Sequence, residues 1–462
     1  MRASFACSAL LAAAFAASCG SSTSNGGGPT PGDAGTPADA TEDVPSDVAT
    51  MADVAPEGAA DSGREGATDG GGAGDAGQVP WPPPLPSGAT DYYVSTMGSD
   101  ANDGSSAHPW LTIAHAAKSI TGGAKPVTVH VLPGTYALTS ATCITSGAAG
   151  TASAPITFIS EVRGGAKIDG KGACTTIWKQ NGAYTNVWGF DFTGMQFAPS
   201  DCGGSGGSTV FDAEPALGNV DFGYDVVHDL PWGFAAAVIM EPYGGGKYTG
   251  APSSVHDSEF LNIGNTPADA GCGPPNNYGM YIASGPETHV FNNLLVNVPT
   301  IAIHCWHAAS GVHIFNNTIV NAGTAVLVGT GDGGATQGAT FEVTNNIVVS
   351  SGYGIYAESS SPGTISTSSV FVDNLVFGNQ KDWGYNDNGT STTLQAAGFS
   401  VMGTVTLDPG FVDAASGDYH LATGSHAIDK GASKGAPDHD LDGIMRPVGP
   451  AWDIGAYEWH GP

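Results

Sequence analysis

Hydrophobic and polar residues alternate in one recurring pattern between Val255 and Asn379. Four segments share a hydrophobic first residue, a polar pair at the third and fourth positions and a second, mostly hydrophobic run: Val290–Asn297, Ile314–Asn321, Val343–Ser350 and Phe371–Gly378. The second polar residues of these segments are Asn293, Asn317, Asn346 and Asn374, which are 24, 29 and 28 residues apart. Short strands interrupted by Asn and Gly at such a period predict a β-solenoid.

A second hydrophobic segment recurs between these polar pairs, as Gly279–Ile282, Ala302–Cys305, Ala325–Val328 and Gly354–Ala357. Successive side chains of a strand point to opposite faces. The pattern therefore predicts an inward set at Met280/Ile282, Ile303/Cys305, Val326/Val328 and Ile355/Ala357. It predicts an outward row at Tyr281, His304, Leu327 and Tyr356, and this row is the place to look for function.

The polar pairs suit the corners between strands. Asn tolerates the left-handed backbone conformation and can hydrogen-bond backbone groups. If each period is one coil, equivalent Asn residues stack at the strand spacing of roughly 4.8 Å. We therefore expect their amides to hydrogen-bond along a ladder.

The N-terminus has the features of an export signal. Arg2 precedes a short apolar run, Leu10–Ala17, and the run Ala16–Gly20 resembles a lipobox in which Cys19 is lipidated. Residues 1–19 are thus expected to be a lipoprotein signal peptide, with the mature protein held at the outer membrane or cell surface. Ordinary secretion is the alternative.

Residues 20–90 are rich in Gly, Ala, Pro, Ser, Thr and Asp and carry 11 acidic residues against one basic residue, Arg64. Such a composition buries too little apolar surface to offset chain entropy, so this segment is expected to be a disordered tether. Residues 91–462 hold 32 acidic and 11 basic residues. A domain of this size can bury an ample hydrophobic core. Its strong negative charge argues against nucleic-acid binding, which needs a basic surface.

Five cysteines follow Cys19. An exported protein can oxidise them, and the favoured pairs are Cys143–Cys174 and Cys202–Cys272, with Cys305 as a buried thiol. Other pairings stay open.

The start of the globular part is a strand near Tyr92, a turn rich in Asp and Gly, and a helical pattern over Leu111–Ile120. This order resembles the secreted right-handed parallel β-helix proteins of the pectate-lyase-like superfamily, in which a short helix caps the first coil. The resemblance implies an all-β fold, a right-handed parallel β-helix over residues 91–405. Residues 406–462, from Leu407 through Tyr457–Glu458, resemble the choice-of-anchor segment that follows such β-helices in bacterial surface proteins.

Candidate catalytic residues lie on and beside the outward row: Tyr281, His304, His307 and Glu241. Groups on neighbouring coils lie roughly 5 Å apart, and on alternate coils about 10 Å apart. These gaps bracket the carboxyl separations of retaining and inverting glycosidases. His or Tyr could instead remove a proton in a β-elimination. The candidates for substrate binding are Trp232, Tyr243, Lys247 and Trp306, and Lys179 is a second lysine to test.

Asp438, Asp440 and Asp442 have the spacing that begins a calcium loop, but Gly449 stands where the bidentate Glu would be. Ca²⁺ is the one cofactor considered. The resulting hypothesis is a monomeric, lipid-anchored surface protein that cleaves an extracellular polysaccharide as a lyase or glycoside hydrolase. A non-catalytic glycan-binding protein or adhesin is the alternative.

Overall fold

A computed structural model describes most of the chain from residue 77 onward, and these residues belong to one compact unit. The described ranges are 77–141, 143–195, 208–214, 218–230, 235–240, 252–264, 277–285, 287–331, 337–359, 364–386 and 394–461. The signal peptide and most of the tether lie outside them. So do seven residues singled out above: Cys19, Cys202, Trp232, Glu241, Tyr243, Lys247 and Cys272.

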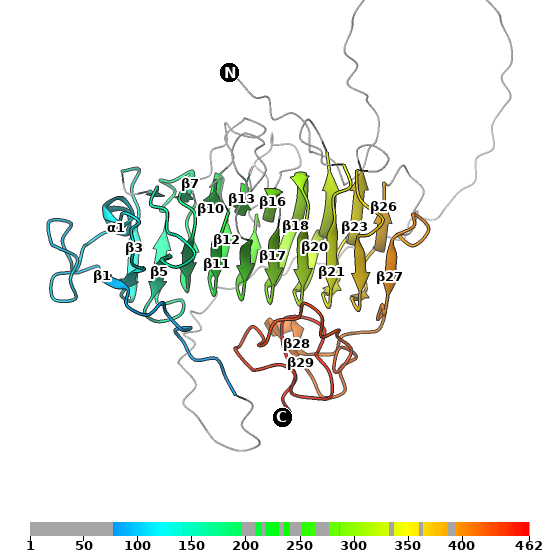
Figure 1. Ribbon diagram of the computed structural model, residues 1–462. Helices are drawn as coiled ribbons and strands as arrows, with labels where there is room; N and C mark the ends of the chain where they lie inside the picture. Colours follow the sequence, from blue (N-terminus) through cyan, green and yellow to red (C-terminus); the bar gives the residue numbers. More distant parts are fainter. Residues whose placement is uncertain are drawn as a thin grey trace, which may run out of the picture. The chain divides into compact units, whose positions relative to one another are not determined.

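The chain winds into a right-handed parallel β-helix (Figure 1), as the repeat and the resemblance predicted. The helix has three faces. Face one is an 11-stranded parallel sheet. Its strands are β1 (Thr90–Val94), β2 (Val127–Val131), β5 (Ile156–Ser160), β8 (Thr185–Trp188), β11 (Val220–Gly223), β14 (Ser253–His256), β17 (Thr288–Phe291), β19 (Val312–Phe315), β21 (Phe341–Thr344), β24 (Val370–Val372) and β27 (Ser400–Met402).

Faces two and three belong to one 16-stranded sheet, because two long strands, β18 (Leu294–Ala309) and β20 (Thr318–Thr330), bend from one face to the other. The other strands of face two are β3 (Gly134–Ala137), β6 (Ala166–Asp169), β9 (Phe190–Thr193), β12 (Val226–Leu230), β15 (Glu259–Ile263), β22 (Ile347–Val349) and β25 (Leu375–Phe377). Those of face three are β4 (Ile144–Ser146), β7 (Thr176–Gln180), β10 (Ser208–Ala213), β13 (Ala235–Met240), β16 (Asn277–Gly285), β23 (Tyr353–Ser359) and β26 (Lys381–Tyr385).

The predicted inward residues form the core. Met280, Ile303, Val326 and Ile355 are in register on neighbouring strands and are fully buried. Large aromatic side chains such as Trp178, Phe211 and Phe222 fill the earlier coils. The expected strand phase is therefore confirmed.

At the corner between faces one and two, the two polar residues have different roles. The first residue takes the left-handed conformation, with φ of 50° at Asn292, 53° at Asn316, 58° at Asn345 and 50° at Asp373. The second residue forms the predicted ladder. Nδ2 of Asn293 donates to Oδ1 of Asn317 at 2.9 Å, and Nδ2 of Asn317 donates to Oδ1 of Asn346 at 2.9 Å. Nδ2 of Asn346 continues the ladder to Asn374 at 3.0 Å.

The N-terminal end is capped as expected. Helix α1 (Ile113–Ser119) follows Thr112, whose side chain accepts a hydrogen bond from the backbone N–H of His115. Its buried residues Ile113, Ala114, Ala116 and Ala117 join the main core. Residues 77–90, which the composition assigned to the tether, are packed instead: the backbone N–H of Val79 donates to Gly443 at 2.7 Å, and the Trp81 ring lies 5.4 Å from that of Tyr224.

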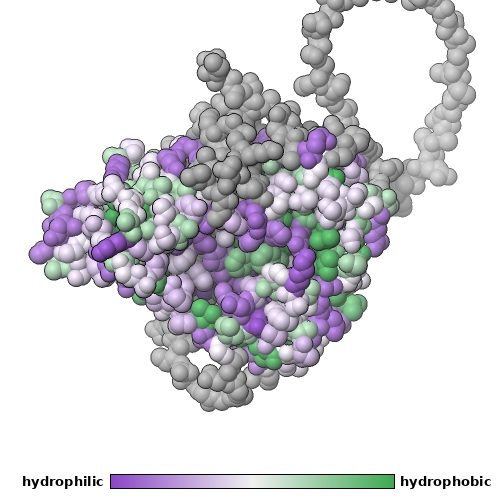
Figure 2. Space-filling view, viewed as in Figure 1, coloured by the Kyte–Doolittle hydropathy of each residue, from purple (hydrophilic) through white to green (hydrophobic). Residues whose placement is uncertain are grey.

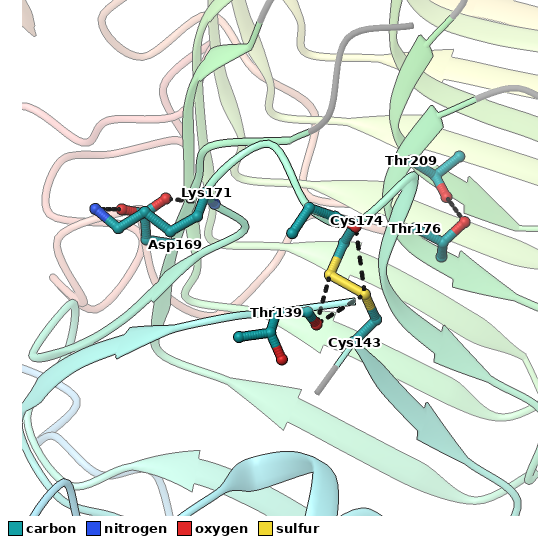
Figure 3. The surroundings of a disulfide bond; sticks show 8 residues. Thr139, Cys143, Asp169, Lys171, Cys174, Thr176 and Thr209 are labelled. Carbon is teal, nitrogen blue, oxygen red and sulfur yellow. Dashed lines mark hydrogen bonds and ion pairs between the residues drawn. A yellow bond between two sulfur atoms is a disulfide. The ribbon is translucent and has the colours of Figure 1, made fainter. Parts of the chain in front are cut away.

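The predicted Cys143–Cys174 disulfide is present, with Cα atoms 5.8 Å apart (Figure 3). The two cysteines precede β4 and β7, which are neighbours on face three. The bond therefore ties two successive coils near the N-terminal end. Cys305 is a buried free thiol, also as expected.

The C-terminal segment contains a small antiparallel pair, β28 (Phe411–Asp413) and β29 (Asp418–Leu421), joined by η3 (Ala414–Ser416). It covers face two, where outward Leu294 and Val296 pack against Tyr419, Leu441 and Tyr457.

The first residues of the corner pairs bind this segment. Nδ2 of Asn292 donates to the His439 carbonyl at 2.7 Å, Nδ2 of Asn316 to the Asp453 carbonyl at 3.0 Å, and Nδ2 of Asn345 to the Ala432 carbonyl at 2.8 Å. Arg163, four coils before Asn292, reaches the Leu441 carbonyl at 3.1 Å. The segment is thus attached along several successive coils.

Candidate functional site

One outward row of side chains runs along face three. Strand pairing places Tyr281 beside His304, His304 beside Leu327 and Leu327 beside Tyr356, as the sequence predicted. The same register continues toward the N-terminus through Ile239, Asp212 and Lys179. The row therefore spans seven coils and combines aromatic, aliphatic and charged residues.

The centre of the row is a group of rings. The centroid of His304 lies 4.9 Å from that of Tyr281 and 4.7 Å from that of Tyr278. The His307 ring lies 5.9 Å from Tyr281, and the Trp306 ring lies 5.8 Å from His304. The structure thus brings together three of the predicted catalytic candidates and one predicted binding residue.

His304 points away from the core, but it is not an open surface residue. It is 3% exposed, and its Nδ1 has no hydrogen-bond partner among the described residues. Burial, with a smaller contribution from His307, lowers the pKa of His304 to about 3. The imidazole is therefore neutral at pH 7 and suits a hydrogen-bonding or packing role, because a group with so low a pKa is a weak base.

A β-bulge positions Trp306 and His307. The register shifts by one residue after Ile282, so this part of β18 carries one residue more than β16 opposite, and His307 has a φ of 51°. A bulge of this kind redirects side chains and is common beside functional sites. A Cβ atom on Gly329 or Gly331 would overlap the Trp306 ring, so glycine at both positions makes room for this side chain.

Sequence reasoning missed an acidic pair on the same row. Asp212 and Glu214 flank the core residue Ala213 at the end of β10 and both point outward. Burial raises the pKa of Asp212 to about 6, with a further increase from Glu214 and an opposing effect from Lys179. Nζ of Lys179 lies 2.9 Å from Oε1 of Glu214. Strand register is the signal that could have found this pair, because Lys179, Asp212 and Tyr281 occupy equivalent positions on their strands. The coils that carry Lys179 and Asp212 are irregular in sequence, so this register is not visible in the repeat.

Four predicted site residues, Glu241, Trp232, Tyr243 and Lys247, lie outside the described ranges. Their positions relative to the row remain expectations. In strand register Glu241 follows Met240, whose partner on β10 is Ala213.

The three candidate calcium ligands have different partners. Asp440 is buried, and its carboxylate accepts hydrogen bonds from the backbone N–H groups of Asp442, Ile444 and Glu458. Oδ2 of Asp442 lies 2.6 Å from Nε2 of His420, and Oδ1 of Asp438 lies 2.7 Å from Nδ1 of His439. Asp440 thus organises the turn, and Ca²⁺ at these residues stays a prediction.

No family model matches the sequence, and no curated protein matches it. Among solved structures, the chain is similar to a glycoside hydrolase (10% identity, TM-score 0.49, 69% of this chain and 93% of the other). It is also similar to a rhamnogalacturonan lyase (14%, 0.41, 78% and 95%) and to the pectin methylesterase PemA from Erwinia chrysanthemi (12%, 0.34, 69% and 90%). Likenesses this distant carry no argument about activity, so the function has to be argued from the chain's own residues.

Proposed function

We propose that face three binds an extracellular polysaccharide and that the protein cleaves its glycosidic bonds. The observation that carries this proposal is the outward row, which places the Tyr281 ring in register with Asp212, two coils away, a carboxyl group with a pKa of about 6. A straight row with one residue per coil, repeating at roughly 4.8 Å, suits a linear polymer. Aromatic rings offer flat apolar surfaces with polar edges for sugars to stack on.

Asp212 has the properties of a general acid. With a pKa of about 6 it holds its proton for part of the time near neutral pH, and it can donate that proton to the leaving glycosidic oxygen. Hydrolysis also needs a second carboxylate to activate water or to attack the sugar. Glu214 is the described candidate, and Glu241 is the other. Tyr281 and His307 would contact the sugar on neighbouring coils, and the buried His304 would support the Tyr281 ring.

Hydrolysis is favoured over β-elimination. Elimination from a uronate requires the substrate carboxylate to be neutralised, which a cation normally does. Lys179 is the cation of the row, and Glu214 already pairs with it at 2.9 Å. Ca²⁺ bound near the row would restore the elimination route, because a bound cation dominates the local field.

The alternative function is glycan binding without cleavage. It is favoured by the burial of His304 and by the ring group around it, which resembles a platform more than a proton-transfer chain. In this case Asp212 would be a hydrogen-bonding residue.

The proposed location is the cell surface, with a lipid on Cys19 and residues 20–76 as the spacer. Within the described ranges, no helix has the length and hydrophobicity needed to cross a bilayer. We expect Cys19→Ser to move the protein from the membrane fraction to the soluble fraction. Retention of this variant in membranes would contradict the lipid anchor.

The test of activity uses the purified protein with a panel of neutral and uronate polysaccharides. New reducing ends without unsaturated products indicate hydrolysis, and ultraviolet absorbance from unsaturated uronates indicates elimination. Asp212→Asn should lower kcat by 100-fold or more. Asp91→Asn, a change of the same type on face one, should leave it unchanged. Binding of a glycan without cleavage under all conditions would support the alternative. If the protein neither binds nor cleaves any of these glycans, both proposals are refuted.

A further inference from the structure

Face one carries a group of metal-ligating side chains far along the chain from Asp212. His289 on β17 and His313 on β19 are register partners on adjacent strands, and Glu287 immediately precedes β17. One potential ligand atom from each of Glu287, His289 and His313 lies within 4.8 Å of the others. The two ring centroids are 5.1 Å apart, with the ring planes at 84°.

A second carboxylate orients one of these histidines. Glu342 on β21 is the register partner of His313, and its Oε2 lies 3.1 Å from Nδ1 of His313. Its other oxygen lies 3.5 Å from Nζ of Lys434. This arrangement leaves Nε2 of His313 for another partner. A carboxylate on the far nitrogen of a histidine is what fixes the ring orientation in many metal sites.

The site is accessible. The side chains of Glu287, His289 and His313 are 46%, 32% and 35% exposed. Figure 2 shows one side of the molecule, on which hydrophobic and hydrophilic residues are interspersed.

We propose that Glu287, His289 and His313 bind a divalent transition-metal ion of the Zn²⁺ class, with Glu342 as the residue that positions His313. Two imidazoles and one carboxylate suit Zn²⁺ better than Ca²⁺ or Mg²⁺, which prefer oxygen ligands. Three protein ligands leave at least one coordination position for water or for a group of another molecule. The ion would also link two successive coils.

The test is zinc binding by the full chain, freed of metal with a chelator and titrated with ZnCl₂ in a calorimeter. One equivalent should bind to the wild type. His289→Gln and His313→Gln should each weaken this site by at least 100-fold, and Glu342→Gln by about 10–100-fold. His426→Gln, a change of an exposed histidine outside the group, should leave it intact.

Two further readouts separate a defined site from loose surface binding. Zn²⁺ should raise the Tm of the wild type and of His426→Gln, but not of His289→Gln or His313→Gln. Co²⁺ in place of Zn²⁺ should give a visible absorption band that both variants lose. Wild-type affinity in either His→Gln variant, or a wild type that binds no zinc at this site, would overturn the proposal.

Discussion

Replacing Asn317 by leucine tests the ladder at a position that has a ladder residue on each side. Asn317 is fully buried, and its Oδ1 accepts from the backbone N–H of Asn293 at 3.1 Å and from Nδ2 of Asn293 at 2.9 Å. Its Nδ2 donates to Asn346 at 2.9 Å and to the Val290 carbonyl at 2.9 Å. Leucine has a similar volume but replaces none of these bonds.

The loss can be estimated from the groups left behind. Nδ2 of Asn293 keeps a second acceptor, the Val255 carbonyl, and Oδ1 of Asn346 keeps the backbone N–H of Asn317. The backbone N–H of Asn293 loses its partner, and the Val290 carbonyl loses one donor. Each unsatisfied buried polar group costs about 1–3 kcal/mol, so Asn317→Leu should cost about 2–5 kcal/mol in the free energy of unfolding.

Urea unfolding followed by circular dichroism measures this difference. The matched control is Asn186→Leu on β8, because Asn186 is partly exposed and its amide makes one side-chain bond, to Thr157 at 3.0 Å. The control should lose less than about 1 kcal/mol. Equal losses in the two variants would refute the argument that the ladder stabilises the corners.

Three other predictions follow from the described contacts. Ile303→Ala should lower the free energy of unfolding by about 2–5 kcal/mol, because Ile303 is a fully buried core residue. His304→Ala should lower it by only about 1–2 kcal/mol, since this change removes ring contacts together with a buried nitrogen that has no partner in the described part of the chain. The reverse order in thermal unfolding would contradict the strand phase. Cys143→Ser with Cys174→Ser should lower stability by about 3–4 kcal/mol from the entropy of a loop of 31 residues, and equal urea midpoints would contradict this. Burial lowers the pKa of His256, but Asp221 and Asp257 outweigh burial and raise it to about 10, so its contribution is complete below pH 6.5 and is lost as pH rises toward 10. The unfolding free energy should therefore fall over this range, and His256→Gln should make the fall shallower.

The regular part of the chain could be predicted from sequence because each signal was local. Alternation fixed the strand phase around Ile303, and the paired Asn residues marked the corners. Asp212 was missed because the earlier coils vary in length, so its register with Tyr281 depends on pairings that the repeat does not show. The Glu287–His289–His313 group was missed because finding it requires knowing which side chains on neighbouring coils point toward one another. The burial of His304 was not foreseen either, since strand alternation says which way a side chain points and not what packs over it.

The C-terminal segment changes how the solenoid can come apart. In a simple solenoid each coil contacts only its neighbours, so coils can detach one at a time from an end. Here a single stretch of chain is hydrogen-bonded to Arg163, Asn292, Asn316 and Asn345, which belong to different coils. None of these coils can leave without releasing the stretch that also holds the others. Their unfolding becomes one cooperative event, and a pulling force transmitted from the N-terminal side would meet the whole block instead of its weakest coil.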